Sequence, residues 1–388
     1  MTKTKKSISI LGILLVQLLV AMPTMAGSSQ ATRDLPLIDA IVLFKPGIKV
    51  PTDLQGVEIK HRYDALNGFS GRMSLGLYEQ LKAAWFVQAI GENGRAHACA
   101  GGSDTLDWGV DGTNAEVVWG GAEDATDIIS GRPTGAGVKI AVLDSGIDYN
   151  HGDLASNYKG GYDFVDDDSD PKDKNGHGTH VAGIIAARDN EYGVIGVAPK
   201  ASLYAVRVLD AQGDGNMGDV CAGINWAINN NMDIITMSLT GPEHSPTASA
   251  LQTAYNSGIV CVAASGNSDN DEVSFPACLS TVIAVGALED DDTRWDLSNY
   301  GTQLELVAPG ADIYSAWKGS SFATKSGTSF ATPMVTGTIA LLLSCDPSLT
   351  PAEIRSVLQT TAWDLGDSGW DQYFGYGKVN TMGAYLYL

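Results

Sequence analysis

The feature of this 388-residue chain that most constrains its fold is a series of short apolar runs in which polar residues do not alternate. Strands that expose one face to water alternate apolar and polar residues, whereas strands covered on both faces are apolar almost throughout. Segments with helical spacing, such as 177–187 and 217–230, lie between these runs. The alternation predicts an α/β fold with a mostly parallel sheet between two layers of helices. The runs are VKIAVLD (138–144), SLYAVRVL (202–209), DIITMSL (233–239), GIVCVAA (258–264) and VIAVGAL (282–288).

The N-terminal region has a different organisation. Residues 1–26 begin with three lysines and continue into an apolar run that ends in small residues. This pattern is typical of a signal peptide and is too short for a confident membrane span, so we expect cleavage near Ala26 and secretion, with an uncleaved anchor as the alternative. Strand, turn and helix patterns over 39–98 predict a small α+β unit, and the Gly- and Asp-rich segment 98–116 predicts a linker. The predicted domains are a signal peptide (1–26), an N-terminal segment with its linker (27–113) and a large α/β domain (114–388).

Charge and cysteine content restrict the partners. Residues 100–388 contain 13 Lys or Arg and 38 Asp or Glu, in a chain of net charge −21. Such a surface repels nucleic acid, and no later run has the length of a membrane span, so we expect neither a nucleic-acid partner nor membrane association after processing. An exported chain can form disulfides, but five cysteines cannot all pair with one another. Loss of a segment containing Cys99 would leave four cysteines, Cys221, Cys261, Cys278 and Cys345. These four can form two disulfides in three different ways, and the sequence does not choose among them.

Four polar residues stand where strands end or helices begin. Asp144 ends an apolar run in VLDSGID, and Asn267 follows another in AASGN. His177 begins a helical segment in NGHGTHVAG, and Ser329 stands at a helix entrance in GTSFATPMV. Singly, each has a structural explanation as a turn residue, a core histidine or a helix cap. Together they supply a nucleophile, a general base, a carboxylate that orients the base and an oxyanion donor, as acyl transfer requires.

These stretches, with YAVRVL, MSLTGP, VIAVGA and GYGKVN, resemble the subtilisin family of serine proteases over residues 114–388. The resemblance implies a subtilisin-like three-layer fold and a serine endopeptidase, in which Ser329 is the nucleophile, His177 the base, Asp144 its orienting carboxylate and Asn267 an oxyanion donor. A lipase-type elbow would need Gly-x-Ser-x-Gly, which GTSFA does not supply. Protein or peptide substrates would bind as an added strand. The implied substrate residues are Gly213, Asp214, Gly215, Ser238, Leu239, Thr240, Ala264 and Gly266, with Thr240 in place of a common glycine.

Resemblance to the thermitase-like branch of the family implies calcium as a cofactor. Carboxylates in the loop YDFVDDDSDPKDKNG are dense enough for a hard cation, and a solvated acidic loop is the alternative. Lys172 stands where the family has a neutral ligand. The implied ligands of this loop are Asp163, Asp166, Asp168 and Asp170. A second site would use Asp153 and Asn190 with backbone carbonyls near Arg188, Tyr192 and Val194, and its remaining ligand would fall at Ala115, whose side chain cannot coordinate.

The unit at 39–98 resembles the inhibitory prosegment of the same family, most clearly in NGFSGRM. This resemblance implies a zymogen that cuts itself between about Ala96 and Asn114 and then acts as a monomer. An N-terminal domain that stays attached is the alternative. Two other functions remain open: a catalytically silent binding or chaperone module on the same fold, and an esterase that uses the same residues.

Overall fold

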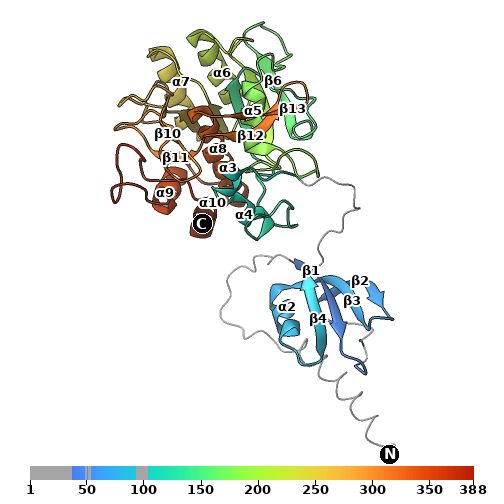
Figure 1. Ribbon diagram of the computed structural model, residues 1–388. Coiled ribbons are helices and arrows are strands. Elements are labelled where there is room, and N and C mark those ends of the chain that lie inside the picture. Colours follow the sequence, from blue (N-terminus) through green and yellow to red (C-terminus); the bar gives the residue numbers. More distant parts are fainter. Residues whose placement is uncertain (1–36, 49, 51–53, 93–103) are drawn as a thin grey trace, which may run out of the picture. The chain divides into compact units, whose positions relative to one another are not determined.

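The computed structural model describes residues 37–48, 50, 54–92 and 104–388 (Figure 1). Contacts divide the chain into two compact units, residues 1–100 and residues 101–388. The predicted signal peptide, residues 1–26, lies outside the described residues.

The small unit is a four-stranded antiparallel sheet, in the order β2-β3-β1-β4, with one helix. Side chains of β1 alternate: Ala40, Val42 and Phe44 are fully buried, whereas Ile41 and Leu43 are half-buried. The structure has the predicted strands and helix and adds β2, whose charged sequence carries no clear strand pattern. The elements are β1 (Leu37–Phe44), β2 (Val57–Tyr63), β3 (Gly68–Ser74), α2 (Leu75–Lys82) and β4 (Val87–Glu92).

The large unit is built on a seven-stranded sheet, β11-β10-β9-β8-β5-β7-β6, in which all neighbouring strands are parallel. The predicted α/β fold is confirmed, and all five apolar runs form strands of this sheet. The strand order reverses beside β5, and ligands of open α/β sheets bind at the carboxyl ends of strands near such a reversal. The strands are β5 (Lys139–Asp144), β6 (Tyr158–Asp163), β7 (Ser202–Arg207), β8 (Ile234–Met237), β9 (Val260–Ala264), β10 (Val282–Leu288) and β11 (Leu306–Pro309).

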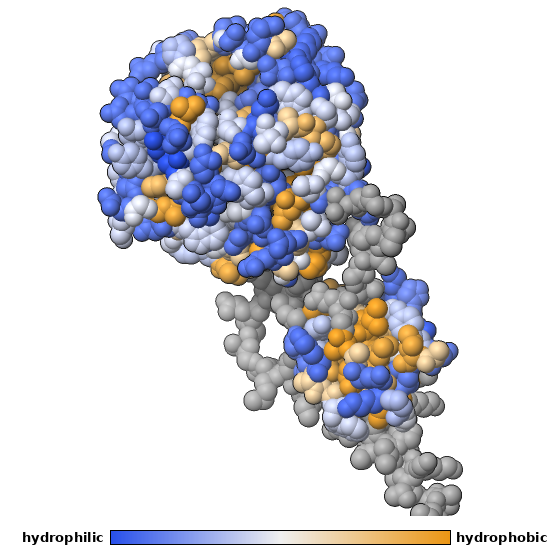
Figure 2. Space-filling model, viewed as in Figure 1, coloured by the Kyte–Doolittle hydropathy of each residue, from blue (hydrophilic) through white to orange (hydrophobic). Residues whose placement is uncertain are grey.

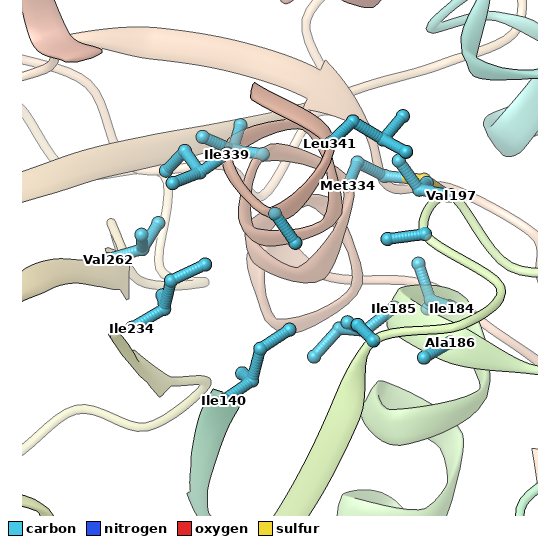
Figure 3. Close-up of a cluster of buried hydrophobic side chains, with 14 of the residues drawn as sticks. Ile140, Ile184, Ile185, Ala186, Val197, Ile234, Val262, Met334, Ile339 and Leu341 are labelled. Atoms are coloured by element: carbon cyan, nitrogen blue, oxygen red, sulfur yellow. The ribbon is translucent and has the colours of Figure 1, made fainter. Parts of the chain in front are cut away.

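Helices cover both faces of this sheet, as the three-layer prediction requires (Figure 1). On one face, α8 packs against Ile140, Ile234 and Val262 of the sheet and against Ile185 of α5 (Figure 3). Helix α8 is long and apolar enough to cross a membrane, but 83% of it is buried, which makes it the central core helix. The helices are α3 (Trp108–Asp111), α4 (Ala115–Gly120), α5 (His177–Ala186), α6 (Met217–Asn229), α7 (Ser245–Asn256), α8 (Thr328–Cys345), α9 (Pro351–Thr361) and α10 (Thr381–Tyr387), and strands β12 (Ile313–Trp317) and β13 (Ser321–Lys325) form a separate hairpin.

The predicted linker, 98–116, requires correction, because from Asp104 onward it is part of the large unit. Asp107 accepts the amide of Gly109 at the start of α3 and the amide of Tyr314, which is 207 residues away in the sequence. Asp104 and Asp107 are both almost fully buried. Aspartate is frequent in exposed loops, but it is equally suited to accept backbone amides. The boundary predicted after residue 113 therefore lies after Ala100.

The surface of the large unit is hydrophilic, as its excess of acidic residues predicts. Figure 2 shows a mostly hydrophilic face on the large unit and a gathering of apolar side chains on the visible face of the small unit.

None of the four cysteines described in the large unit is bonded to another: Cys221, Cys261, Cys278 and Cys345.

Candidate active site

Asp144 and His177 are hydrogen-bonded at the carboxyl edge of the sheet. Asp144 ends β5 and is fully buried, and its two carboxylate oxygens lie 2.8 and 2.9 Å from Nδ1 of His177. Gly178 permits this approach, because a Cβ there would lie 2.2 Å from the carbonyl oxygen of Gly146. Burial lowers the pKa of His177, but the charge and hydrogen bond of Asp144 outweigh it and the pKa is raised. The pair can therefore hold an imidazole that gains and loses a proton.

His180, the other histidine of the same motif, is a core residue. Its Nε2 lies 2.9 Å from the carbonyl oxygen of Ala323, and its ring packs edge-on against Phe330. Burial lowers its pKa to about 4, so the ring is neutral at neutral pH. The role of a core histidine, which the sequence alone left open for His177, thus belongs to His180.

Ser329 lies in the first turn of α8, but it does not cap this helix. The N-cap is Gly327, which has no side chain to accept an amide. The amides of Thr328 and Phe330 are bonded to Asn267 and Gly327, whereas the amide of Ser329 has no acceptor among the described residues, so a free donor and partial positive charge remain beside the serine. Pro333 has no amide hydrogen and leaves the carbonyl of Ser329 without its helical donor. The hydroxyl of Ser238 supplies that donor at 2.7 Å, and the hydroxyl of Ser329 donates to the carbonyl of Ser238 at 3.1 Å. The proline is thus tolerated because a neighbouring strand end replaces the missing hydrogen bond.

Asn267 follows β9 and faces the same helix entrance. Its Oδ1 accepts the amide of Thr328 at 2.9 Å and the hydroxyl of Thr328 at 2.7 Å. Its Nδ2 has no acceptor among the described residues and can donate into the cleft that Asn267 lines with Ser329. Gly327 has a φ of 154°, and a Cβ there would lie 3.2 Å from that nitrogen. A side chain at position 327 would therefore crowd the donor.

His177, Asn267 and Ser329 line one cleft of about 740 Å³, whereas Asp144 lies behind His177 and is not part of the lining. Two segments, 213–215 and 238–240, form its walls, as expected for a substrate that binds as an added strand. Gly266 does not line the cleft; its amide donates to the hydroxyl of Thr328 at 3.3 Å. An apolar part of the lining was not predicted, because the spacing of Met217 and Val220 on α6 is that of ordinary core residues. The predicted residues that line the cleft are His177, Gly213, Asp214, Gly215, Ser238, Leu239, Thr240, Ala264, Asn267 and Ser329.

Oxygen atoms gather at a second place, around the loop 188–194. Asp153 is fully buried and accepts the amide of Val194 at 3.0 Å and the side-chain amide of Asn190 at 3.1 Å. Asp104 accepts three consecutive backbone amides of this loop, at residues 190–192. Burial is the largest influence on the pKa values of Asp104 and Asp153 and raises both. A hard cation would favour the ionised form of these two carboxylates.

The position at which the family's remaining ligand was expected to fall, Ala115, lies away from this loop. Ala115 begins α4 and is buried in the apolar core, whereas Asp104 brings a carboxylate to the loop. The contacts of Asp104 with this loop could not be predicted from the sequence, because they join positions 86 to 88 residues apart, for which local spacing gives no signal. Because residues 98–116 were predicted to be a linker, neither the burial of Asp104 nor its contacts with residues 190–192 were expected.

The four carboxylates expected to bind calcium in the loop 163–170 do not meet at one point. Asp163 and Asp166 both pair with the buried guanidinium of Arg207. Asp168 instead accepts the backbone amide of Asp170 at 2.8 Å. In the part of the chain that the structure describes, no three His, Cys, Asp or Glu side chains converge as a metal site. The contacts in this loop thus support an ion-paired turn better than a calcium site.

The fold and the site together define a class of protein. A buried carboxylate, an imidazole, a serine at a helix entrance and an amide donor meet at the carboxyl edge of a parallel α/β sheet. This is the set of groups that a serine hydrolase uses for acyl transfer.

The comparisons with known proteins identify the family. The subtilase family profile matches residues 135–377. The chain is 44% identical over 255 residues to subtilisin DY of Bacillus licheniformis, a match that covers 64% of this chain and 91% of that protein. It is 45% identical over 252 residues to subtilisin Savinase of Lederbergia lenta, covering 65% and 91%, and 46% identical over 257 residues to subtilisin NAT of Bacillus subtilis subsp. natto, covering 65% and 66%. The chain belongs to the subtilase family and is a serine-type endopeptidase.

Proposed function

We propose that this chain is a secreted endopeptidase that hydrolyses peptide bonds through an acyl-enzyme on Ser329. In this proposal His177 is the general base and acid, Asp144 orients it, and Asn267 forms the oxyanion hole with the Ser329 amide. The observation that carries the proposal is the buried carboxylate of Asp144, bonded to Nδ1 of His177 in the cleft that also contains Ser329.

The reaction steps follow from the contacts at the site. The hydroxyl of Ser329 turns from the Ser238 carbonyl to Nε2 of His177, which takes its proton as the oxygen attacks the scissile carbonyl carbon. Asp144 accepts a hydrogen bond from Nδ1–H of His177 and stays ionised, so Nε2 is presented to the serine and the imidazolium is stabilised. Asn267 and the Ser329 amide donate to the new oxyanion, and His177 then protonates the leaving amine. Water then attacks the acyl-enzyme with the help of the same groups, the bond between the acyl carbon and Ser329 breaks, and the carboxylic acid product leaves.

For the substrate, we propose a protein or peptide in an extended conformation. Its backbone would pair with 213–215 and 238–240 as an added strand, a mode that reads shape more than side chains. Ala264 and the exposed Thr240 line the cleft and would border the first side chain on the acyl side. A catalytically silent module would have no use for a buried carboxylate bonded to an imidazole, and an esterase would have little use for two extended walls.

We further propose that the small unit is an inhibitory prosegment that the enzyme removes from itself. Ile41 and Leu43 lie on the face of β1 opposite its buried residues and are only half-buried, which suits them to contact another surface. Figure 2 shows further apolar side chains on the visible face of this unit. Because Asp104 is held within the large unit, we expect the cleaved bond to fall ahead of Asp104, in the first part of the predicted range.

The test is the intact mass of the protein recovered from the culture medium, for the native sequence, Ser329→Ala and a control, Ser326→Ala. We expect the native chain and the control to lose a fragment that ends ahead of Asp104, and Ser329→Ala to retain it. If the native chain retained the fragment, self-processing would be refuted. If Ser329→Ala lost it as well, another protease would process the chain. Turnover of an unstructured protein by the purified enzymes would then decide the endopeptidase role separately.

We propose that calcium binds at the loop 188–194 and stabilises the enzyme. Carboxylates of Asp104 and Asp153, the side-chain oxygen of Asn190 and carbonyl oxygens of the loop are the donors that calcium prefers, and the two carboxylates are buried. Calcium would supply positive charge that holds the loop and the segment at Asp104 together.

Calcium removal is therefore expected to lower the melting temperature. Ligand at about 100 times its Kd stabilises by about 2.7 kcal/mol, which corresponds to roughly 5–10 °C in a domain of this size. We expect a chelator to produce this shift in the native enzyme and to have little effect on Asp104→Asn, measured by calorimetry with the active site inhibited. Asp170→Asn, in the other acidic loop, is the control and should respond like the native enzyme. A response lost in Asp170→Asn and kept in Asp104→Asn would assign the calcium to the loop 163–170 instead.

A further inference from the structure

Lys325 is an exposed cation four residues ahead of Ser329, and its charge acts on the imidazole of His177. It ends β13, and its Nζ lies 4.8 Å from the ring centre of Trp317. Trp317 in turn packs against Gly176, the residue before His177, so closely that a Cβ on Gly176 would lie 2.4 Å from the indole. Lys325 has no carboxylate partner among the described residues.

This pair of residues flanks His177 outside the cleft described above. Residues 213–215 and 238–240 line that cleft, whereas Trp317 and Lys325 do not. In the proposed reaction these two segments hold the acyl side of the substrate, and His177 protonates the leaving amine. The chain that departs must therefore extend past His177 on the side away from the acyl-binding walls, where the hairpin of β12 and β13 packs on α5 through Ala323.

The electrostatics of the site agree with this placement. Burial, which is the largest influence, and the positive charge of Lys325 lower the pKa of His177, whereas Asp144 and Asp173 raise it, and together they leave the pKa raised. The ammonium group is therefore within electrostatic reach of the imidazole. Lys325 is also one of few positive charges in an acidic unit, because residues 100–388 carry 38 acidic and only 13 basic residues.

We propose that Lys325, supported by Trp317, forms a subsite that favours an Asp or Glu side chain within the first two residues after the cleaved bond. This inference rests on the proposed endopeptidase function. An exposed ammonium group that lies over an indole ring is held in place by the ring and not by a carboxylate. It can therefore form an ion pair with a carboxylate of the substrate. The acidic remainder of the enzyme would otherwise repel such a substrate, so the preference depends on this one residue.

The sequence that follows the proposed self-cleavage site is acidic. If the prosegment is cut ahead of Asp104, the leaving side begins at or near that residue. From Asp104 to Ser130 the chain has seven Asp or Glu residues and no Lys, Arg or His, and the first basic residue is Arg132. A cut after Gly102 or Ser103 would place Asp104 within the first two residues of the leaving side, where the proposed subsite could accept it.

The test compares two peptides that differ only in one residue after the cleaved bond, Asp in one and its neutral isostere Asn in the other. We expect the native enzyme to favour the Asp peptide by roughly 2- to 5-fold in kcat/KM at low salt, the range for an exposed ion pair, and less at high salt. Lys325→Met should bring the ratio close to one, and Lys325→Glu should reverse it. Lys318→Met, on the same hairpin but with its amine donated to the carbonyl of Lys174, is the control and should keep the preference.

The outcomes separate the inference from the function on which it rests. Cleavage of neither peptide by the native enzyme would refute the endopeptidase function. Cleavage of both with the same ratio in the native enzyme and Lys325→Met would refute the subsite alone. An equal loss of preference in Lys318→Met would assign the effect to the general field of the hairpin and would also overturn the role given to Lys325.

Discussion

Replacement of His177 by alanine is expected to lower kcat by about 10⁶-fold, the loss known for the triad of subtilisin itself and so a precedent for the family. The reason is that no other described group can take the proton of Ser329: the neighbouring His180 is bonded to a backbone carbonyl, and burial lowers its pKa to about 4. Turnover of a peptide with a chromogenic leaving group measures the loss. The matched control is His244→Ala, a histidine bonded to Thr247 at the start of α7, which should keep full activity.

The variant is expected to fold, because the side chain of His177 is 24% exposed and lines the open cleft, so its loss leaves no closed cavity in the core. Its prosegment should remain attached, as in Ser329→Ala, so activity should be assayed with the segment removed by a second protease. If the processed variant retained turnover within tenfold of the native enzyme, the assignment of His177 as the base would be wrong.

The pH profile tests the same pair of residues. The neutral imidazole is the active form, so kcat/KM falls as the pH drops through the pKa of His177 in the free enzyme. Burial lowers that pKa, and the negative charge of Asp144 raises it above its ordinary value. Asp144→Asn removes the raising charge, so the acid limb should move to lower pH while kcat falls by about 10⁴-fold, as in other triads. An acid limb that stays in place would show that it belongs to another group.

The residues that meet at the proposed active site could be located from the sequence because each stands in a short segment whose local pattern is sufficient. Asp144 ends an uninterrupted apolar run, and His177 and Ser329 begin segments with helical spacing. Since parallel strands gather their carboxyl ends at one edge, the topology brings these residues together without any long-range detail. The five buried strands were predictable for the same reason.

Features that depend on distant partners could not be predicted in this way. Asp104 and Asp107 stand in a segment with the composition of a linker, and only contacts with residues 190–192 and Tyr314 show that it is packed. Spacing in the loop 163–170 suggested calcium, but the guanidinium of Arg207, on β7, pairs with two of its carboxylates. In both cases the deciding group lies on another element, where local spacing carries no information.

Loss of the side-chain donor of Asn267 is expected to lower kcat on the order of 10²–10³-fold with little change in KM. This range comes from an oxyanion donor of subtilisin, and it applies here because Nδ2 of Asn267 has no acceptor among the described residues and lies at the entrance of α8. The charge on the oxygen develops only in the transition state, so the interaction lowers the barrier without strengthening substrate binding.

Two variants separate the donor from its support. Asn267→Leu removes both the donor and the acceptor that Thr328 uses, whereas Thr328→Val removes only one of the two hydrogen bonds that orient Asn267. We expect the full loss of kcat in the first and a smaller loss in the second, because the amide of Thr328 still holds Oδ1 of Asn267 at 2.9 Å. Steady-state kinetics on one peptide, with melting temperatures to exclude unfolding, measures both. A rise in KM at unchanged kcat in Asn267→Leu would mean that Asn267 binds the substrate and does not stabilise the oxyanion.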